Sequence, residues 1–460
     1  MRVLIIGAGE AALKLLATIS DSTYQVVAFV DDDPDKIGTT ISGLPVLGPI
    51  DQLAKIARET ETKEIMIAIP SAQSSLIRRV VEIAGRNHLK SKIIPRTIDI
   101  VRGLVRFEQV RDIEPADLLG RPVVRHDLDS TREILKDKTI MITGAAGSIG
   151  SGLAWQIAIL GPKKIICFDF NESAMFALEN NLSQYGANVK YVIGNIVDKE
   201  RVDQVIKQHR PDVIFHAAAY KHVPLMEKNI VEAVKNNVLG TKTVALSAIS
   251  NEVSDFILIS SDKAINPKSI MGATKRIVEK MMYVLAKMAK TRFSGVRFGN
   301  VLVSNGSVIP VFEEQIRSGG PVTITNPEMK RYFMTIEEAV QLVIQSWALG
   351  KNGEIFVLDM GEPIKIIDLA NNLIRAYGFV PGSDIKVKII GGRPGEKLFE
   401  EISTDQSKVS RTEHSKIFIV KKEEDFDPDE FLNIVKKLEK AKEDSELKEL
   451  IKKAVPNYDF

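Results

Sequence analysis

The sequence lacks several features that would assign it to whole classes of protein. Its 460 residues include one cysteine, Cys167, so no intramolecular disulfide can form. No stretch approaches the roughly 20 apolar residues of a membrane span, and Glu10 and Lys14 interrupt the apolar N-terminus. Charge of one sign is also missing, because 62 basic and 60 acidic residues leave a net charge of +2. Because the two signs are so evenly balanced, the protein has no overall electrostatic field that would attract nucleic acid. We therefore expect a cytoplasmic protein with no nucleic-acid partner and no membrane span in this chain.

Two openings of a nucleotide-binding fold are present, each a strand followed by a glycine turn and a helix. The first places Gly7-Ala8-Gly9 after the apolar run 3–6, and the second places Gly144 to Gly150 after the run 139–143. Other strand-length apolar runs alternate with helical segments, at 26–30, 65–69, 165–168, 213–215 and 256–259. This alternation predicts an α/β protein with two tandem Rossmann-like, doubly wound parallel-sheet domains.

The same patterns suggest the domain boundaries. We expect an accessory Rossmann-like domain over residues 1–125 and a catalytic domain over 137–425, which includes a small C-terminal substrate-binding part. Residues 426–460 form a charged tail. Its apolar residues recur at helical spacing and predict amphipathic helices: Phe431, Ile434, Val435, Leu438, Leu447, Leu450 and Ile451.

The second glycine turn has the spacing of a dinucleotide site. Gly144, Gly147 and Gly150 would allow the tight turn, the approach of a pyrophosphate and close helix packing. The helix N-terminus would direct free N–H groups at the phosphates. Asp169 follows at about the 20-residue distance expected of an acid that bonds the ribose hydroxyls. Because a carboxylate there repels a 2′-phosphate, the sequence favours NAD over NADP.

The first turn leaves two interpretations open. Gly7-x-Gly9-x-x-Ala12 precedes a strand that ends at Asp31-Asp32-Asp33. This arrangement is compatible with dinucleotide binding, and equally with a structural or regulatory domain that keeps the turn without a ligand.

A polar cluster follows the apolar run 256–259, in the string Ser260-Ser261-Asp262-Lys263. Open α/β sheets bind ligands at the carboxyl ends of their strands, so this string is a candidate active site. The extended short-chain dehydrogenase/reductase superfamily, which the chain resembles, pairs Ser or Thr with Tyr-x-x-x-Lys. Here Met271 stands at the tyrosine position, and Lys275 is retained.

Over residues 137–410 the chain resembles the large, polysaccharide-biosynthesis type of UDP-N-acetylglucosamine 4,6-dehydratase. The strings that carry the resemblance are His216–Glu227, Ser260–Pro267, Met271–Arg276, Arg297–Asn300, Gly306–Pro310, Arg331–Thr335 and Arg393–Lys397. Large members of this family carry an extra Rossmann domain, and membrane helices usually precede it. The resemblance therefore also implies membrane association if a tethering segment has been removed, and a homo-oligomer as the expected assembly.

The resemblance implies an internal redox cycle. Oxidation at carbon 4 of the sugar is followed by water loss across carbons 5 and 6, and the hydride returns to carbon 6. The product would be a UDP-4-keto-6-deoxy-N-acetylhexosamine. By resemblance, Asp262 protonates the leaving hydroxyl, Lys263 takes the carbon-5 proton, and Ser261 belongs to the same catalytic group. Since the thioether of Met271 cannot accept the carbon-4 hydroxyl proton, Lys275 or a water that it orders is the candidate acceptor.

The remaining expected contacts divide between cofactor and substrate. Besides the turn glycines and Asp169, the cofactor set comprises Ser148, Ile149, Asn195, Ile196, Ala217, Ala218 and Lys275. The substrate set comprises Lys221, His222, Asn300, Arg331 and Arg393, with the arginines directed at the UDP diphosphate. His216 and His222 have no third ligand at matching spacing, so we expect no metal.

Two rival functions remain at this stage. A UDP-sugar 4-epimerase would share the fold, NAD and the first oxidation, but it relies on the missing tyrosine. A non-catalytic NAD-binding sensor would tolerate that loss, although the retention of Asp262, Lys263 and Lys275 argues against it.

Overall fold

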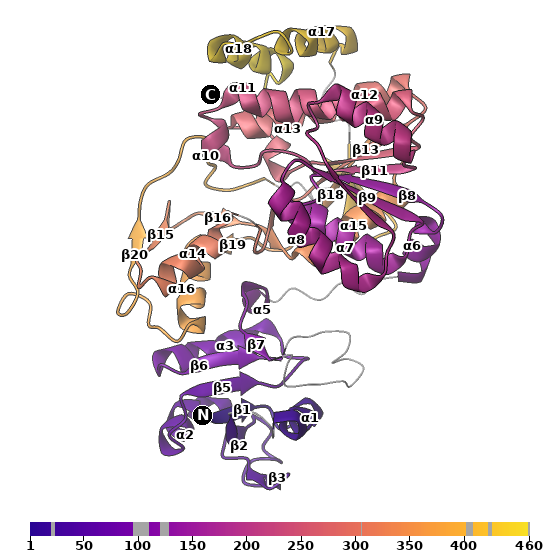
Figure 1. Cartoon of the computed structure of the whole chain (residues 1–460). Coiled ribbons are helices and arrows are strands. Elements are labelled where there is room, and N and C mark those ends of the chain that lie inside the picture. The colour runs from indigo at the N-terminus through magenta and orange to yellow at the C-terminus, as the bar shows by residue number, and fades with distance from the viewer. Residues whose placement is uncertain are drawn as a thin grey trace. The chain divides into compact units, whose positions relative to one another are not determined.

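The computed structural model describes residues 1–19, 24–94, 110–119, 128–304, 306–401, 408–421 and 426–458. The chain forms two compact units. Unit 1 comprises Met1–Val123, Gly306–Met329 and Ile364–Gly391, and unit 2 comprises Val124–Asn305, Lys330–Pro363 and Gly392–Phe460. The expected boundaries at residues 125 and 425 lie outside the described residues. Both units contain a largely parallel sheet, which confirms the predicted α/β class (Figure 1).

Unit 1 is built on a five-stranded sheet of order β2-β1-β5-β6-β7, parallel except for β7. Its strands are β1 (Arg2–Ile6), β2 (Gln25–Val30), β5 (Glu64–Ile67), β6 (Lys90–Ile93) and β7 (Arg111–Asp112). Smaller elements are β3 (Thr40–Ile41), β4 (Leu44–Pro45) and η1 (Ile50–Gln52). The helices are α1 (Glu10–Ile19), α2 (Leu53–Glu59), α3 (Ser74–Arg86) and α5 (Pro115–Leu119). Alternate strand residues enter two separate apolar clusters, as a sheet covered on both faces requires.

Two segments distant in sequence join unit 1. They contain α14 (Val308–Arg317), β15 (Val322–Ile324), β19 (Ile364–Lys365), α16 (Ile366–Ala376) and β20 (Val387–Ile389). Helix α16 packs so closely on α3 that a Cβ atom at Gly85 would lie 3.0 Å from the Arg375 backbone. Ala376 belongs to the same apolar cluster as α3. In terms of packing, these segments therefore group with the N-terminal unit, whereas the sequence suggested a continuous catalytic domain over 137–425.

Unit 2 contains a nine-stranded sheet of order β10-β9-β8-β11-β12-β13-β18-β22-β21. Its strands are β8 (Thr139–Thr143), β9 (Lys164–Asp169), β10 (Val189–Ile193), β11 (Val213–His216), β12 (Asp255–Ile259), β13 (Arg292–Arg297), β18 (Glu354–Leu358), β21 (Val409–Arg411) and β22 (Ile417–Val420). The first seven in this order run parallel, and β22 and β21 add antiparallel pairs at one edge. The short strands of the unit are β14 (Asn300–Val301), β16 (Lys330–Arg331) and β17 (Phe333–Met334).

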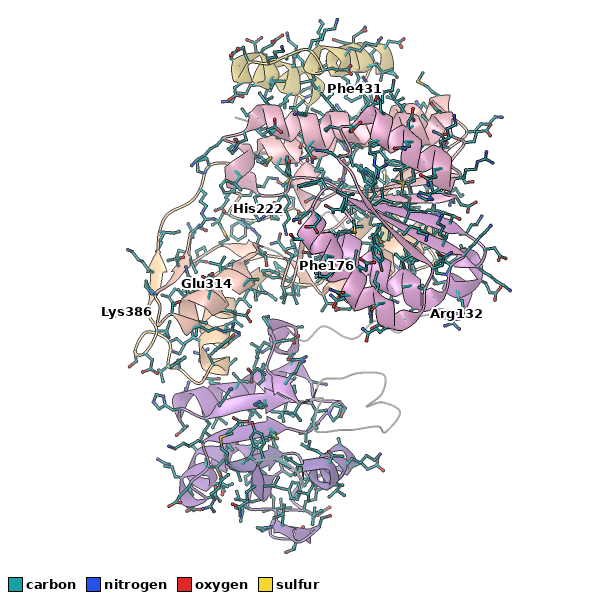
Figure 2. The ribbon with its side chains drawn as sticks, viewed as in Figure 1. Arg132, Phe176, His222, Glu314, Lys386 and Phe431 are labelled. Carbon is teal, nitrogen blue, oxygen red and sulfur yellow. The ribbon has the colours of Figure 1, made fainter. Side chains whose placement is uncertain are left out.

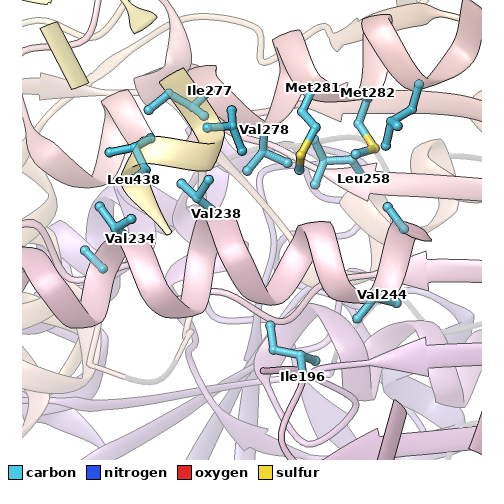
Figure 3. Packing of buried hydrophobic residues seen from close by; sticks show 14 of the residues in the cluster. Ile196, Val234, Val238, Val244, Leu258, Ile277, Val278, Met281, Met282 and Leu438 are labelled. Carbon is cyan, nitrogen blue, oxygen red and sulfur yellow. The ribbon is translucent and has the colours of Figure 1, made fainter. Parts of the chain in front are cut away.

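Helices cover both faces of this sheet (Figure 1). On one face lie α6 (Leu128–Leu135), α7 (Ser148–Leu160), α8 (Glu172–Leu182) with η3 (Ser183–Tyr185), and α15 (Ile336–Leu349). On the other lie α9 (Lys199–His209), α10 (Val223–Met226), α11 (Ile230–Ala233), the π-helix η4 (Val234–Gly240), α12 (Thr241–Ser250) and α13 (Ile270–Met288). Figure 3 shows Val234 and Val238 of η4 gathered with Ile277 and Val278 of α13.

The predicted helical tail is present as two helices, α17 (Pro428–Leu438) and α18 (Asp444–Ala454). Their periodic apolar residues are all buried in the cluster that includes α13. The buried Lys280 of α13 donates to the Ala454 carbonyl at the end of α18, at 3.0 Å. Among the described residues, no helix is both long enough and apolar enough to cross a bilayer.

The order of strands places a topological switch point in unit 2. Strand β8 pairs with β9 on one side and with β11 on the other, so successive crossovers leave in opposite directions. Ligands of open α/β sheets bind at the carboxyl ends of the strands beside such a point. Asp169 is the last residue of β9, and the carboxyl ends of β8, β11 and β12 lead into the second glycine turn, Ala217 and the Ser261–Lys263 string.

Candidate active site

The second glycine turn forms a cradle that side chains would fill. Gly144 has φ +67°, and a Cβ atom there would lie 2.6 Å from the Ala218 nitrogen. At Gly150 a Cβ atom would lie 2.0 Å from the Gly144 carbonyl oxygen. Gly147 is the N-cap of α7, whose first residues are Ser148 and Ile149. Gly144 and Gly150 are thus required by the local backbone, while a Cβ atom at Gly147 would lie 3.2 Å from the Gly144 carbonyl oxygen. Helix α7 begins where phosphate groups would need N–H donors.

Asp169 closes the cradle at the end of β9. Its Oδ2 accepts from the Ala146 amide at 3.0 Å, and its Oδ1 accepts from the Asn171 amide at 2.9 Å. The residue is only 7% exposed. The carboxylate is therefore held at the rim of the turn, the position from which an acid can meet ribose hydroxyls.

The other residues expected at the cofactor differ in their surroundings. Ala217 and Ala218 follow β11 directly and are half-buried, with the backbone of Ala218 against Gly144. Asn195 is exposed, and its side chain accepts from the Val197 amide at 3.1 Å. Ile196 is 4% exposed and packs against Gly240, so its side chain belongs to the core. Only its backbone could contribute to a site.

A hydrogen-bonded asparagine that the sequence analysis missed fixes the loop after β11. Asn237 lies in the π-helix η4 and is 2% exposed. Its amide accepts from the Tyr220 N–H at 2.8 Å and donates to the Tyr220 carbonyl at 3.0 Å. It also donates to Thr274 of α13 at 3.1 Å. Asn237 thereby ties the loop that carries Lys221 and His222 to the helix that carries Met271 and Lys275.

The predicted acid and base lie together where β12 ends. Asp262 is 1% exposed, and its Oδ1 accepts from the Ser261 hydroxyl at 2.8 Å and from Lys263 Nζ at 3.0 Å. Its other oxygen, Oδ2, is buried without a hydrogen-bond partner among the described residues. Lys263 Nζ also donates to Asn300 Oδ1 at 3.2 Å. The structure therefore brings together Ser261, Asp262, Lys263 and Asn300.

A second carboxylate, Glu400, reaches the same lysine and was not predicted. Glu400 Oε1 lies 3.6 Å from Lys263 Nζ and 3.7 Å from Arg331 Nε. Burial alone would lower the pKa of Lys263, but the carboxylates of Asp262 and Glu400 outweigh it and hold that pKa above its ordinary value. No local spacing signals Glu400, although it closely follows the Arg393–Lys397 string.

Arg331 is engaged by the backbone of the segment before Glu400. Its guanidinium donates to the carbonyls of Lys397 at 2.6 Å and Leu398 at 3.2 Å. Since Arg331 is also 8% exposed, these contacts give it a structural task. By contrast, Arg393 is solvent-exposed on the same segment. Lys221 and His222 are exposed too, between β11 and α10 (Figure 2 labels His222).

Helix α13 supplies the remaining predicted groups. Met271 is 3% exposed and belongs to the apolar cluster beneath α13. Lys275 donates to the Ile259 carbonyl at 2.8 Å, and burial lowers its pKa to about 8 although Glu279 partly opposes this. The lysine is thus fixed beside the end of β12, and its neutral form is accessible near neutral pH.

A buried ion pair anchors α13 below Lys275. Arg297 donates to both carboxylate oxygens of Glu279 at 2.7 Å, and Ser260 donates to one of them at 2.5 Å. Burial would raise the pKa of Glu279, but Arg297 holds it below its ordinary value. The pair fixes α13 against β13, one strand away from the Ser261–Lys263 string.

His216 is a structural residue. It is 1% exposed, and its ring nitrogens bond the hydroxyls of Thr143 at 2.7 Å and Thr241 at 2.8 Å. Burial lowers its pKa to about 3, so the ring is neutral. It links the ends of β8 and β11 to α12. No group of three metal-ligating side chains forms in the part of the chain that the structure describes.

A glycine turn bonded to Asp169 lies at the switch point of the parallel sheet, and the buried Lys275 of α13 lies beside the end of β12. This fold and this arrangement are those of the extended short-chain dehydrogenases/reductases. The family follows from comparison with known proteins. The model of the polysaccharide biosynthesis protein family matches residues 140–422. The chain belongs to this family. A CoA-binding domain model matches residues 1–95.

Two curated relatives cover most of the chain. The probable polysaccharide biosynthesis protein EpsC of Bacillus subtilis and the capsular polysaccharide biosynthesis protein CapD of Staphylococcus aureus are each 44% identical over 407 residues. Each match covers 87% of this chain and 68% of the relative.

Solved structures support the fold. Pen from Bacillus thuringiensis has a TM-score of 0.58 and 33% identity, covering 64% of this chain and 89% of its own. The dTDP-glucose 4,6-dehydratase DesIV from Streptomyces venezuelae, crystallised with NAD and TYD, has a TM-score of 0.52 and 19% identity. That match covers 58% of this chain and 88% of DesIV, and at this identity it speaks for the fold alone.

Proposed function

We propose that the protein is an NAD-dependent 4,6-dehydratase that acts on UDP-N-acetylglucosamine. This proposed activity is narrower than what the family and the fold support, which is an NAD-dependent enzyme that modifies nucleotide sugars. The observation that carries the proposal is the contact between Asp262 and Lys263 at the end of β12, where an acid and a base can reach one sugar.

The residues of the second glycine turn fit the proposed cofactor. Gly144 and Gly150 allow the backbone of the turn to pack closely at the start of α7, where a pyrophosphate would meet N–H groups, and Asp169 stands at the rim for the ribose. When bound, NAD supplies the hydride acceptor at carbon 4 and the hydride donor at carbon 6. DesIV, which shares the fold, was crystallised with NAD.

The side chains divide the proton transfers among them. Lys275, whose pKa burial lowers to about 8, takes the carbon-4 hydroxyl proton directly or through a water. Lys263 takes the carbon-5 proton, which the neighbouring ketone acidifies. Asp262, the carboxylate partner of Lys263 before the reaction, takes up a proton and gives it to the leaving hydroxyl at carbon 6, and its unpartnered Oδ2 is the oxygen free to do so.

The partners that we assign to the substrate diphosphate differ from the two arginines expected from the sequence. Arg393, Lys221 and His222 are exposed, and we assign the anionic contact to these side chains. Asn300 and Arg331 instead act from beneath the sugar, where they meet Lys263 and Glu400.

The absence of a tyrosine argues against the epimerase alternative. The buried Met271 at that position has no group that could take and return the carbon-4 hydroxyl proton. An epimerase would also have no use for the Asp262 and Lys263 pair.

Mass spectrometry of the nucleotide sugar tests the proposal. The purified protein is incubated with NAD and UDP-N-acetylglucosamine, and a product lighter by one water is expected. An isomer of unchanged mass would replace the dehydratase by an epimerase. Binding of NAD without any product would leave a non-catalytic sensor.

A further inference from the structure

Glu400 is a buried acid placed against the proposed base. Its side chain is 4% exposed, and its Oε1 faces both Lys263 and Arg331. An isolated parallel bridge from Lys330 to Phe399 and the carbonyl contacts of Arg331 hold this segment in place. Burying a carboxylate is costly unless charges compensate it, so a side chain of this kind calls for a functional explanation.

Two acidic and two basic side chains are in contact around Lys263 Nζ. Asp262, Glu400 and Arg331 are the charged groups that act on Lys263, while Asn300 is its neutral neighbour. Lys263 Nζ therefore lies between two carboxylates, 3.0 Å from Asp262 Oδ1 and 3.6 Å from Glu400 Oε1. With Arg331 included, the formal charges cancel only while Lys263 carries its proton.

We propose that Glu400 is the positioning residue of the carbon-5 base, holding the Lys263 ammonium in place and setting the pH at which it becomes a free amine. This inference rests on the proposed function for the role of Lys263, and on the observed contacts for the coupling itself. The Oε2 atom of Glu400 is buried and has no hydrogen-bond partner within the described ranges. Its pairing with Arg331 offsets part of the cost of burial, and its other charged contact is with Lys263.

The sign of the effect follows from the charges. A carboxylate beside an ammonium favours the protonated form, so Lys263 becomes a base only at higher pH than it otherwise would. Removing the charge of Glu400 should release the proton at lower pH. The rising limb of kcat against pH, which reports the base in the enzyme–substrate complex, should move in the same direction.

The test compares Glu400→Gln with Glu401→Gln in the holoenzyme. Glu401 is the neighbouring acid, half-exposed and paired with Lys397 and Asn266 outside the Lys263 contacts. Pulsed acetylation with acetic anhydride across pH, read by peptide mass spectrometry, gives the titration of Lys263 without requiring turnover. We expect its midpoint to fall by about one pH unit or more in Glu400→Gln and to stay unchanged in Glu401→Gln. The kcat limb should shift with it, and KM should change little.

Several results would overturn the inference. An unchanged Lys263 midpoint in Glu400→Gln would show that the two groups are not coupled. Loss of turnover at every pH with an unchanged midpoint would mean that Glu400 acts on the sugar itself. If Glu400→Gln fails to fold, Glu400→Asp keeps the charge at a greater distance and should lower the midpoint by a smaller amount; no change there would also reject the coupling. Should the wild-type enzyme release no water, the proposed function fails, while the acetylation result still decides whether Glu400 controls Lys263.

Discussion

The two glycine turns of this chain share one hydrogen-bond pattern and differ in what surrounds it. In unit 1 the Ala8 amide donates to Asp31 Oδ2 at 2.7 Å, and in unit 2 the Ala146 amide donates to Asp169 Oδ2 at 3.0 Å. In both, the other carboxylate oxygen accepts from the amide two residues further on, at 2.9 Å. An acid bonded to the turn is thus a property of the fold and does not by itself reveal a ligand.

The differences lie in packing and in the neighbouring strands. Gly150 packs against the Gly144 carbonyl, and the matching position of the first turn is Ala12. At Gly9 of the first turn, no atom lies within 4 Å of where a Cβ atom would be. Asp31 is also paired with Lys36 at 3.4 Å. Only unit 2 adds the Ser261–Lys263 string and Lys275 at the same sheet edge. We therefore place the proposed chemistry at the second turn and the strand ends beside it.

The largest expected effect on activity comes from replacing Lys263, since unit 1 has no counterpart of the Ser261–Lys263 string. Replacing Lys263 by Ala should lower water elimination by about a thousandfold, the scale of a lost general base. NAD affinity should not change, because Lys263 does not contact the glycine turn. Mass spectrometry of the product and a fluorescence titration of NAD measure the two quantities. Elimination at an undiminished rate would remove Lys263 from the mechanism.

Glycine substitutions compare the crowding in the two turns. Gly150→Ala places a Cβ atom 2.0 Å from a backbone oxygen, so we expect a loss of about 3 kcal/mol in the free energy of unfolding and of most NAD affinity. Gly9→Ala meets no neighbour and should change stability by about 0.5 kcal/mol or less. Thermal unfolding checks both. Equal losses would contradict the packing difference between the turns.

Matched acid substitutions test which turn holds the dinucleotide. Asp169→Asn removes the charge that would bond the ribose hydroxyls and should weaken NAD about tenfold. Asp31→Asn should leave NAD affinity unchanged, since the proposed site lies in unit 2. Isothermal titration of NAD against each variant gives the answer. A matching loss in Asp31→Asn would locate NAD binding in both turns.

The smallest effect is a pH dependence. Because the pKa of Lys275 is lowered to about 8, its neutral form increases as pH rises through that value. Oxidation at carbon 4, followed by rapid-mixing absorbance, should rise about threefold between half a unit below and half a unit above this pKa. Lys275→Arg stays protonated and should abolish the rise. A flat wild-type profile would exclude Lys275 as the proton acceptor.

Local sequence was sufficient for the parts of the fold that repeat a simple pattern. The apolar runs that end at Val30, Phe168 and Ile259 are strands, since each is short, apolar and followed by a polar turn. The contacts among Ser261, Asp262 and Lys263 were foreseeable because neighbours on one loop stay together.

Contacts between distant segments could not be predicted. Glu400 reaches Lys263 because the bridge at Lys330 and the carbonyl contacts of Arg331 fix its segment, and no spacing in one sequence encodes this. Arg331 was expected at the diphosphate; the structure shows that its NH1 and NH2 groups donate to backbone carbonyls and that its Nε lies 3.7 Å from Glu400, contacts that no spacing predicts. Likewise, the packing of α16 on α3 depends on the small Gly85, which gives no signal of its partner.

The most direct test of the proposed dehydratase mechanism is the reaction of UDP-N-acetylglucosamine in deuterium oxide. If Lys263 removes the carbon-5 proton during elimination and then delivers one that has exchanged with the solvent, the wild-type product has lost one water and gained one deuterium at carbon 5. Lys263→Ala should form about a thousandfold less of this product. A product that has lost water but retains the original hydrogen at carbon 5, or a substrate isomer of unchanged composition, would contradict the proposed mechanism.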